Sequence, residues 1–187
     1  MKVSALPDLP GPLLLEPRVF RDDRGSFMEL HQEERYAAVG IADRFVQDNL
    51  STSRRNVLRG LHLQHPHGQG KLITVLQGEV FDVAVDVRRG SPTFGRWAGM
   101  TLSAGSGQQL WIPPGFAHGF LALSEQVLFS YKCTQRYVLA HEITIRWDDP
   151  TIGIEWPVAS PILSEKDATA PTLAELPAGR LPVHQDG

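Results

Sequence analysis

The sequence predicts an all-β fold, an antiparallel sandwich, barrel or jelly roll, with a few short helices. One observation favours this class, and a second bounds the number of domains. Between about Val19 and Trp156, short apolar or alternating runs recur, and Gly, Pro, Asn, Asp or Ser residues separate them as in turns. No internal repeat, low-complexity tract or linker divides the chain, so residues 1–187 are expected to form a single domain.

The expected elements follow in chain order. Residues 32–39 have helical composition and end at Gly40. The predicted strands are residues 72–76, 80–87, 109–112, 119–123, 127–133 and 143–147. A short helix is expected to begin at Ser164, whose side chain can cap free backbone N–H groups. Residues 171–187 carry prolines and a glycine and are predicted to be a loose tail.

Composition sets the broad class of protein. Hydrophobic residues make up 42% of the chain and charged residues 21%, which is typical of a globular protein. The net charge of −3 and the absence of a basic block argue against a nucleic-acid partner. No apolar run approaches the ~20 residues of a membrane span, and residues 1–12 lack a secretory signal. A single cysteine, Cys133, fits a reducing cytoplasm, so a cytoplasmic enzyme without membrane contact is expected.

Two spaced blocks resemble the paired motif of the cupin superfamily, a jelly-roll barrel that often holds a metal. They are residues 60–71 and 107–118, and their histidines are His62, His65, His67 and His118. Lys71 stands where the superfamily has a glutamate ligand. An ammonium cannot coordinate a metal while it is protonated, so neither a metal nor another cofactor is expected.

Further segments extend this resemblance over residues 20–167. They include FRDDRGSFME (20–29), FVQDNLS (45–51), VLRGLH (57–62), WIPPGFAHGF (111–120), YKCT (131–134) and LSEKD (163–167). Together they strongly resemble the dTDP-4-dehydrorhamnose 3,5-epimerase family. That resemblance implies a metal-free jelly roll, usually a homodimer that exchanges N-terminal strands, here about residues 1–18. The implied substrate is the dTDP-linked 4-keto-6-deoxy sugar dTDP-4-dehydro-6-deoxy-D-glucose, converted to dTDP-4-dehydro-L-rhamnose by inversion at carbons 3 and 5.

The resemblance also implies roles for four residues. His62 matches the base that removes a proton next to the ketone, and Asp167 matches its orienting partner. Lys71 matches the lysine near the keto oxygen, where an ammonium stabilises a developing enolate. Tyr131 matches the proton donor on the opposite face of the sugar, which inversion requires. Taken singly, a histidine or tyrosine at a strand end is more often structural; the joint match favours catalysis.

Other positions match the family's nucleotide site. The polar ones are Arg24, Glu29, Gln47, Asn49, Arg59, His118, Glu142 and Lys166. The aromatic ones, which could stack on thymine or equally belong to the core, are Phe20, Phe27 and Tyr137. Arginine and lysine suit the diphosphate, because a guanidinium can hold phosphate oxygens bidentately.

Departures from the family pattern at Leu63, Gln135 and Arg136 are expected to border the pocket, where they could change which carbons are inverted. A mono-epimerase of a deoxysugar pathway therefore stays an alternative. A metal-dependent cupin using His65, His67 and His118 is a second, less favoured class. A sugar-nucleotide binder without catalysis is a third, and a retained base and acid argue against it.

Overall fold

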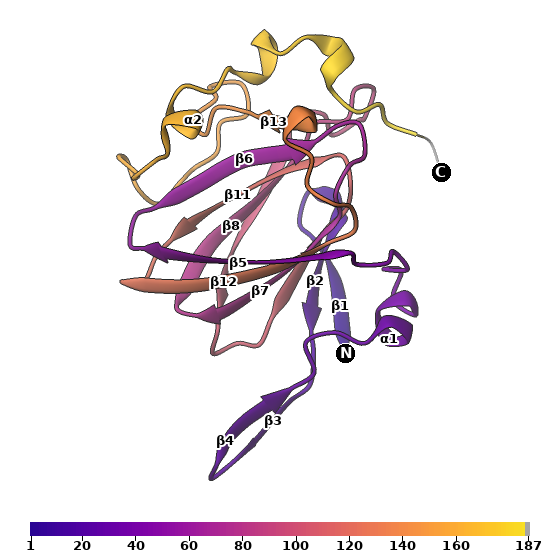
Figure 1. The fold of residues 1–187 in the computed structure, drawn as a ribbon, viewed down its shortest axis with the longest axis vertical. Coiled ribbons are helices and arrows are strands. Elements are labelled where there is room, and N and C mark those ends of the chain that lie inside the picture. The colour runs from indigo at the N-terminus through magenta and orange to yellow at the C-terminus, as the bar shows by residue number, and fades with distance from the viewer. Residues whose placement is uncertain (186–187) are drawn as a thin grey trace.

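In the computed structural model, which describes residues 1–185, two sheets face each other and a hairpin projects from one end (Figure 1). The six-stranded sheet has the order β1 (Lys2–Leu6), β2 (Leu9–Glu16), β10 (Gln109–Ile112), β7 (Lys71–Gln77), β12 (Gln126–Cys133) and β5 (Gln47–Arg54). The five-stranded sheet has the order β13 (Glu142–Thr144), β6 (Leu58–Gln64), β11 (Phe116–Ala122), β8 (Glu79–Asp86) and β9 (Trp97–Ser103). All pairings within these sheets are antiparallel, so the predicted all-β class is confirmed.

Four predicted strands lie within about one residue of their observed bounds, namely β7, β8, β10 and β12. Two predictions were partly wrong. β11 begins three residues earlier than predicted, at Phe116, and the strand predicted over residues 143–147 ends at Thr144. Of the remaining strands in the two sheets, β5, β6 and β9 were not predicted. In β5, the sequence QDNLSTSR lacks the apolar alternation that identifies a half-buried strand.

The two predicted helices are present and short. In α1 (Glu33–Ala37), the Gln32 side chain accepts a hydrogen bond from the backbone N–H of Arg35. In α2 (Glu165–Ala168), the Ser164 hydroxyl accepts from the backbone N–H of Asp167, as the sequence suggested. Three single 3₁₀ turns lie at Leu139–His141, Leu173–Glu175 and Ala178–Arg180. Among residues 1–185, no helix combines the length and apolar character needed to cross a membrane.

The main core fills one part of the space between the sheets. Apolar side chains of β7 and β10 meet those of β8 and β11, and the rings of Phe120 and Phe129 stack with centroids 4.0 Å apart. The remaining space between the sheets is lined by polar side chains, described below. The space between the two sheets therefore contains an apolar core and, next to it, a polar cavity.

A second apolar cluster lies on the outer face of the five-stranded sheet. It explains why β8 is apolar on both faces, since Val83 and Val85 pack outward against the C-terminal segment. Leu173 and Leu181 of that segment are buried in the cluster, and the buried Asp149 carboxylate accepts from the Leu173 backbone N–H at 2.6 Å. The prediction of a loose tail was wrong for residues 171–185, and residues 186–187 lie outside the described chain.

The N-terminal region has two parts. β1 and β2 pair with each other and with β10 of the same chain. The following hairpin of β3 (Val19–Asp22) and β4 (Gly25–Met28) extends away from both sheets (Figure 1). Exchange of residues 1–18 concerns a second chain and stays a prediction.

Candidate active site

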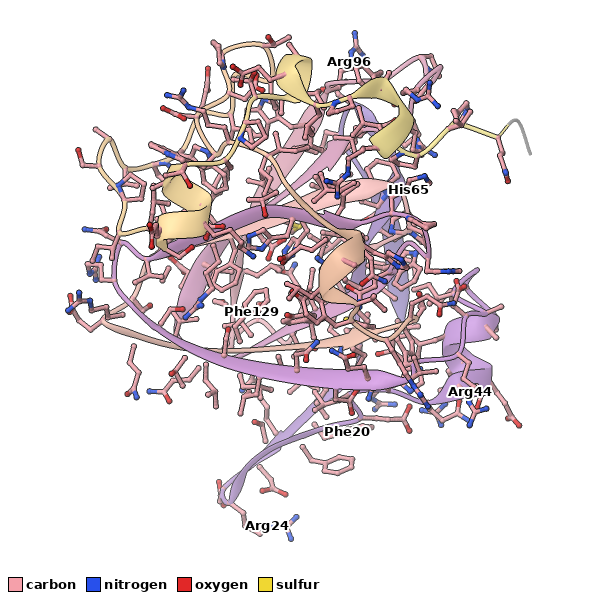
Figure 2. All side chains as sticks on the ribbon, turned by 45° about the horizontal axis from the view of Figure 1, so that its top comes forward. Phe20, Arg24, Arg44, His65, Arg96 and Phe129 are labelled. Carbon is pink, nitrogen blue, oxygen red and sulfur yellow. The ribbon has the colours of Figure 1, made fainter. Side chains whose placement is uncertain are left out.

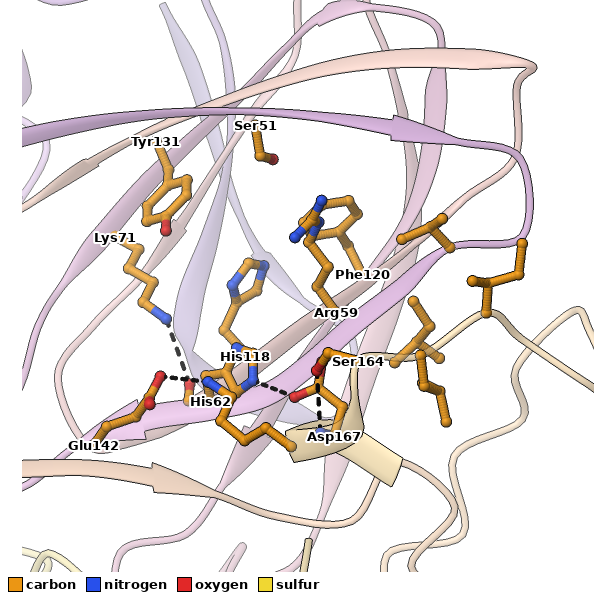
Figure 3. Close-up of a pocket in the computed structure, with 15 residues that line it drawn as sticks. Ser51, Arg59, His62, Lys71, His118, Phe120, Tyr131, Glu142, Ser164 and Asp167 are labelled. Carbon is orange, nitrogen blue, oxygen red and sulfur yellow. Dashed lines mark hydrogen bonds and ion pairs between the residues drawn. The ribbon is translucent and has the colours of Figure 1, made fainter. Parts of the chain in front are cut away.

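A cavity of about 610 Å³ opens between the two sheets (Figure 3). Its lining residues are Ser51, Val57, Leu58, Arg59, His62, Lys71, His118, Phe120, Tyr131, Glu142, Ile162, Leu163, Ser164, Lys166 and Asp167. The structure thus brings together all four residues predicted to be catalytic, from β6, β7, β12 and α2. Four of the predicted binding residues join them, namely Arg59, His118, Glu142 and Lys166.

His62 and Asp167 form a hydrogen-bonded pair across a separation of 105 residues. The His62 Nε2 lies 2.7 Å from the Asp167 Oδ1, and the side chains are 25% and 3% exposed. Burial acts to raise the pKa of Asp167, but the hydrogen bond and electrostatic attraction of the His62 ring outweigh it, so this pKa lies below its ordinary value. An ionised carboxylate on Nε2 fixes that nitrogen as the N–H, which leaves Nδ1 to accept a proton.

Local geometry explains how distant segments meet at this pair. Gly60 has φ +123°, and a Cβ there would lie 2.6 Å from the Cα of Gly119, so β6 approaches β11 this closely only with glycine. On the other side, the Ile162 carbonyl accepts from the Leu58 N–H at 3.0 Å, and the Ile162 N–H donates to the Asn56 carbonyl at 2.7 Å. These bonds hold the segment before α2 against the start of β6, which places Asp167 beside His62.

Lys71 begins β7 and is 8% exposed. Burial lowers the pKa of its ammonium below the ordinary value. Its Nζ donates one long hydrogen bond, 3.4 Å, to the His62 carbonyl, and among residues 1–185 it has no carboxylate partner. A buried cation without a counter-ion can stabilise an oxyanion bound in the cavity.

Tyr131 reaches the cavity from β12, so it comes from the opposite sheet to His62. Figure 3 shows its hydroxyl on the Lys71 side of the cavity, with His62 across from it. Burial raises the pKa of the phenol, so the group keeps its proton at neutral pH. A protonated acid facing a base across a cavity is the arrangement that proton removal and return on opposite faces require.

His118 has a buried partner that the sequence analysis did not assign. Its Nε2 lies 3.0 Å from Asp82 Oδ1 and 3.1 Å from Oδ2, and the two side chains are 7% and 0% exposed. Burial lowers the pKa of His118 even though the Asp82 charge acts to raise it. The signal for Asp82 was present in the sequence, since a carboxylate shares a strand face with Val80 and Ala84.

Polar contacts extend the site at its rim. The Lys166 Nζ lies 2.8 Å from the Glu142 carboxylate, to which the Tyr137 hydroxyl donates at 3.2 Å. The Tyr137 N–H donates to Gln47, whose amide donates to Asn49. Gln47, Asn49 and Tyr137 therefore adjoin the cavity without lining it.

Four predicted binding residues lie away from the cavity of their own chain. Phe20, Arg24 and Phe27 belong to the projecting hairpin, where Phe27 is 70% exposed and Arg24 lies at the tip (Figure 2). Glu29 forms an ion pair with Arg35 at 3.0 Å instead of facing the cavity. The expectation that these four residues join the others in one site is not met within a single chain.

The three departures from the family pattern also lie off the cavity wall. Leu63 is buried in the outer apolar cluster, on the opposite face of β6 from His62. Gln135 and Arg136 are exposed, and their carbonyls accept hydrogen bonds from the side chains of Gln69 and Gln64. The prediction that they border the pocket was wrong.

The histidines of the metal-cupin alternative are not gathered. His118 lines the cavity, whereas His67 is exposed and its ring lies 5.4 Å from that of His141. Within residues 1–185, no group of three or more His, Cys, Asp or Glu side chains is arranged to hold a metal ion.

Comparisons with known proteins agree with this geometry. The family model described as dTDP-4-dehydrorhamnose 3,5-epimerase matches residues 7–175. The Salmonella typhimurium dTDP-4-dehydrorhamnose 3,5-epimerase is 53% identical over 173 residues, covering 91% of this chain and 93% of its own.

Two solved structures are also similar. The epimerase of Legionella pneumophila, in complex with dTDP-4-keto-L-rhamnose, matches with a TM-score of 0.95 and 48% identity over 99% of both chains. A 3'-monoepimerase from Streptomyces bikiniensis, in complex with dTDP-quinovose, matches with a TM-score of 0.87 and 36% identity over 94% of this chain and 91% of its own. The chain belongs to the dTDP-4-dehydrorhamnose 3,5-epimerase family.

Proposed function

We propose that the chain inverts carbons 3 and 5 of dTDP-4-dehydro-6-deoxy-D-glucose to give dTDP-4-dehydro-L-rhamnose. The observation that carries the proposal is the cavity in which His62 and Tyr131 face each other from opposite sheets beside the Lys71 cation. A relative with 53% identity carries the name of this activity, which supports two inversions over one.

Each inversion is one proton removed and one returned. The free Nδ1 of His62 takes the proton from the carbon next to the ketone, and the electron pair moves to the keto oxygen as an enolate. The Lys71 ammonium stabilises that oxyanion, while the Asp167 carboxylate stabilises the imidazolium. Tyr131 then protonates the carbon from the opposite face. His62 is 25% exposed, so solvent can take its proton before the second carbon reacts.

The test is turnover in heavy water with the dTDP-linked 4-keto sugar, followed by NMR. The proposal expects deuterium at both carbon 3 and carbon 5, because solvent resets the base and acid between steps. Deuterium at carbon 3 alone or carbon 5 alone would assign a mono-epimerase instead. A His62→Ala variant that kept full exchange would overturn the role of the base.

A metal-dependent reaction is tested separately. Metal analysis of the purified protein and activity after dialysis against a chelator distinguish the classes. Unchanged turnover in chelator is expected for a lysine-stabilised enolate. Loss of turnover that returns with an added divalent cation would favour the metal-dependent alternative.

Under this proposal the protein is a homodimer. The β3–β4 hairpin of each chain contributes to the substrate site of the second copy of the chain. The β3–β4 hairpin exposes Phe20 and Phe27 at 49% and 70%, and its tip carries Arg24, all at positions that match the family's nucleotide site. A hairpin with exposed aromatic side chains and a cation is suited to a neighbouring nucleotide site rather than to water.

Mixing two inactive variants tests this arrangement. Arg24→Ala removes the hairpin cation, and His62→Ala removes the base. If the hairpin serves the partner's site, a mixed dimer has one site with both residues intact, so an equal mixture regains about a quarter of wild-type sites. Light scattering gives the oligomeric state. A monomer, or a mixture with no recovery after exchange of subunits is verified, would contradict the proposal.

A further inference from the structure

Strand β5 presents an unusual inner face. Its inward residues Gln47, Asn49, Ser51 and Ser53 are all polar, and they alternate with exposed residues along the edge of the six-stranded sheet. A strand that faces a cavity with hydroxyls and amides must satisfy those groups, because a buried polar atom without a hydrogen bond costs free energy.

Three of the four groups are satisfied within the chain. Gln47 donates to Asn49 and accepts from the Tyr137 N–H, and the Asn49 amide contacts the Cys133 sulfur at 3.5 Å. The Ser53 hydroxyl accepts from the Arg59 Nε at 3.1 Å.

The Ser51 hydroxyl is the exception. Its oxygen is buried and, within residues 1–185, has no hydrogen-bond partner. Ser51 lines the cavity, and Figure 3 shows its side chain directed into it. A cavity wall that leaves one hydroxyl unsatisfied is prepared for a group supplied by the ligand.

The charge beside Ser51 indicates which ligand group this is. The Arg59 guanidinium rests against the same stretch of β5, with Nη2 3.1 Å from the Thr52 carbonyl in addition to its bond to Ser53. Both partners are neutral, and among residues 1–185 no carboxylate forms an ion pair with Arg59. An uncompensated guanidinium next to a free hydroxyl is suited to a phosphate oxygen, with Arg59 and Ser51 both donating.

We infer that Ser51 is a substrate-binding residue whose hydroxyl donates to the diphosphate of the sugar nucleotide beside Arg59. His62, Lys71 and Tyr131 then act on the sugar, while Ser51 and Arg59 hold the diphosphate of the same ligand in the same cavity. This inference rests on the proposed function for its ligand, but binding of dTDP alone tests it without any turnover.

The experiment compares dTDP binding by calorimetry for wild type, Ser51→Ala and Ser130→Ala. Ser130 is the matched control because it removes a hydroxyl from the neighbouring strand β12 and does not line the cavity. A hydrogen bond to a charged group corresponds to a loss of roughly 10- to 100-fold in affinity for Ser51→Ala. Ser130→Ala is expected to leave the Kd unchanged.

Stability of the ligand-free protein separates binding from a structural role. Ser51→Ala removes an unsatisfied buried hydroxyl, so its thermal midpoint is expected to equal or exceed that of wild type. A lowered midpoint together with weaker binding would mean that Ser51 supports the fold, and would overturn the inference.

Two other outcomes would also overturn it. An unchanged Kd for dTDP in Ser51→Ala refutes the phosphate contact, and if KM for the keto sugar rises at the same time the contact is to the sugar. The proposed function fails independently of this result if wild type binds dTDP and does not exchange protons of the keto sugar. If wild type does not bind dTDP, both fail.

Discussion

Replacing Asp167 with asparagine tests whether the carboxylate beside His62 is catalytic. The substitution keeps the side-chain volume and the backbone N–H that Ser164 caps, so α2 is expected to form as before. It removes the negative charge 2.7 Å from the His62 Nε2. The asparagine amide can also donate to that nitrogen, which would place the N–H on Nδ1 and block the base.

The expected loss of kcat/KM in Asp167→Asn follows from the burial of the His62–Asp167 pair. A hydrogen bond to a charged group is worth roughly 1.5–3 kcal/mol, and Asp167 is only 3% exposed, so solvent screens it little. At about 1.4 kcal/mol per tenfold, the loss of imidazolium stabilisation alone lowers kcat/KM by roughly 10- to 150-fold. Stabilisation of the wrong tautomer extends the loss toward the ~10⁴-fold seen when an Asp–His pair is broken in this way in serine proteases.

The assay is the initial rate of deuterium exchange into the keto sugar at neutral pH. The rate is expected to fall because the imidazolium formed during proton removal loses the carboxylate that stabilises it. Asp148→Asn is the matched control, because it breaks an exposed ion pair with Arg146 that is worth little. A folded Asp167→Asn protein whose kcat/KM stays within about threefold of wild type would refute the reasoning.

Three further variants address other groups. Tyr131→Phe is expected to abolish the inverted product while exchange of the substrate proton persists, because the base remains; loss of both by NMR would contradict a donor role. Lys71→Met is expected to lower kcat by about 10²–10³-fold, the cost of one oxyanion donor; a change confined to KM would refute it. Asp86, buried with the Arg88 guanidinium and two hydroxyls, has a pKa of about 2, below its ordinary value near 4. Asp86→Asn should therefore lower the free energy of unfolding by about 2 kcal/mol at pH 7, in urea titrations, and the difference should disappear as the pH falls from 4 to 2; a constant difference would argue against it.

The parts of the fold that the sequence predicted are those with a local signal. The strands β7, β8 and β12 carry apolar runs that end at turn residues, and Ser164 provides a capping group for α2. The parts that it missed depend on distant partners. β5 faces a polar cavity instead of a core, and the C-terminal segment is held by Leu173, Leu181 and the Asp149 carboxylate.

The residues of the site likewise fall into those that the sequence identified and those that it missed. Family resemblance identified the four residues that the structure brings together, although no spacing rule predicts that His62 meets Asp167 across 105 residues. Asp82 and Ser51 were missed because each becomes significant only through its surroundings: one pairs with a buried histidine, and the other has no partner at all among the described residues.

The residues proposed for proton transfer lie on the two sheets, whereas some of those proposed for nucleotide binding lie on the hairpin, and this separation bears on how many carbons are inverted. His62, Lys71 and Tyr131 lie on strands whose registers are fixed by hydrogen-bonded neighbours, so the distance between His62 and Tyr131 does not depend on a flexible segment. The hairpin residues that match the family's nucleotide site lie outside this frame. A second inversion requires the same base and acid to reach a second carbon, which means that the sugar turns or slides while the nucleotide stays bound. Under the proposed mechanism, the contacts that hold the diphosphate set whether one or two carbons react. The residues to exchange between a 3,5-epimerase and a mono-epimerase are therefore those that hold the diphosphate, with the base and the acid kept constant.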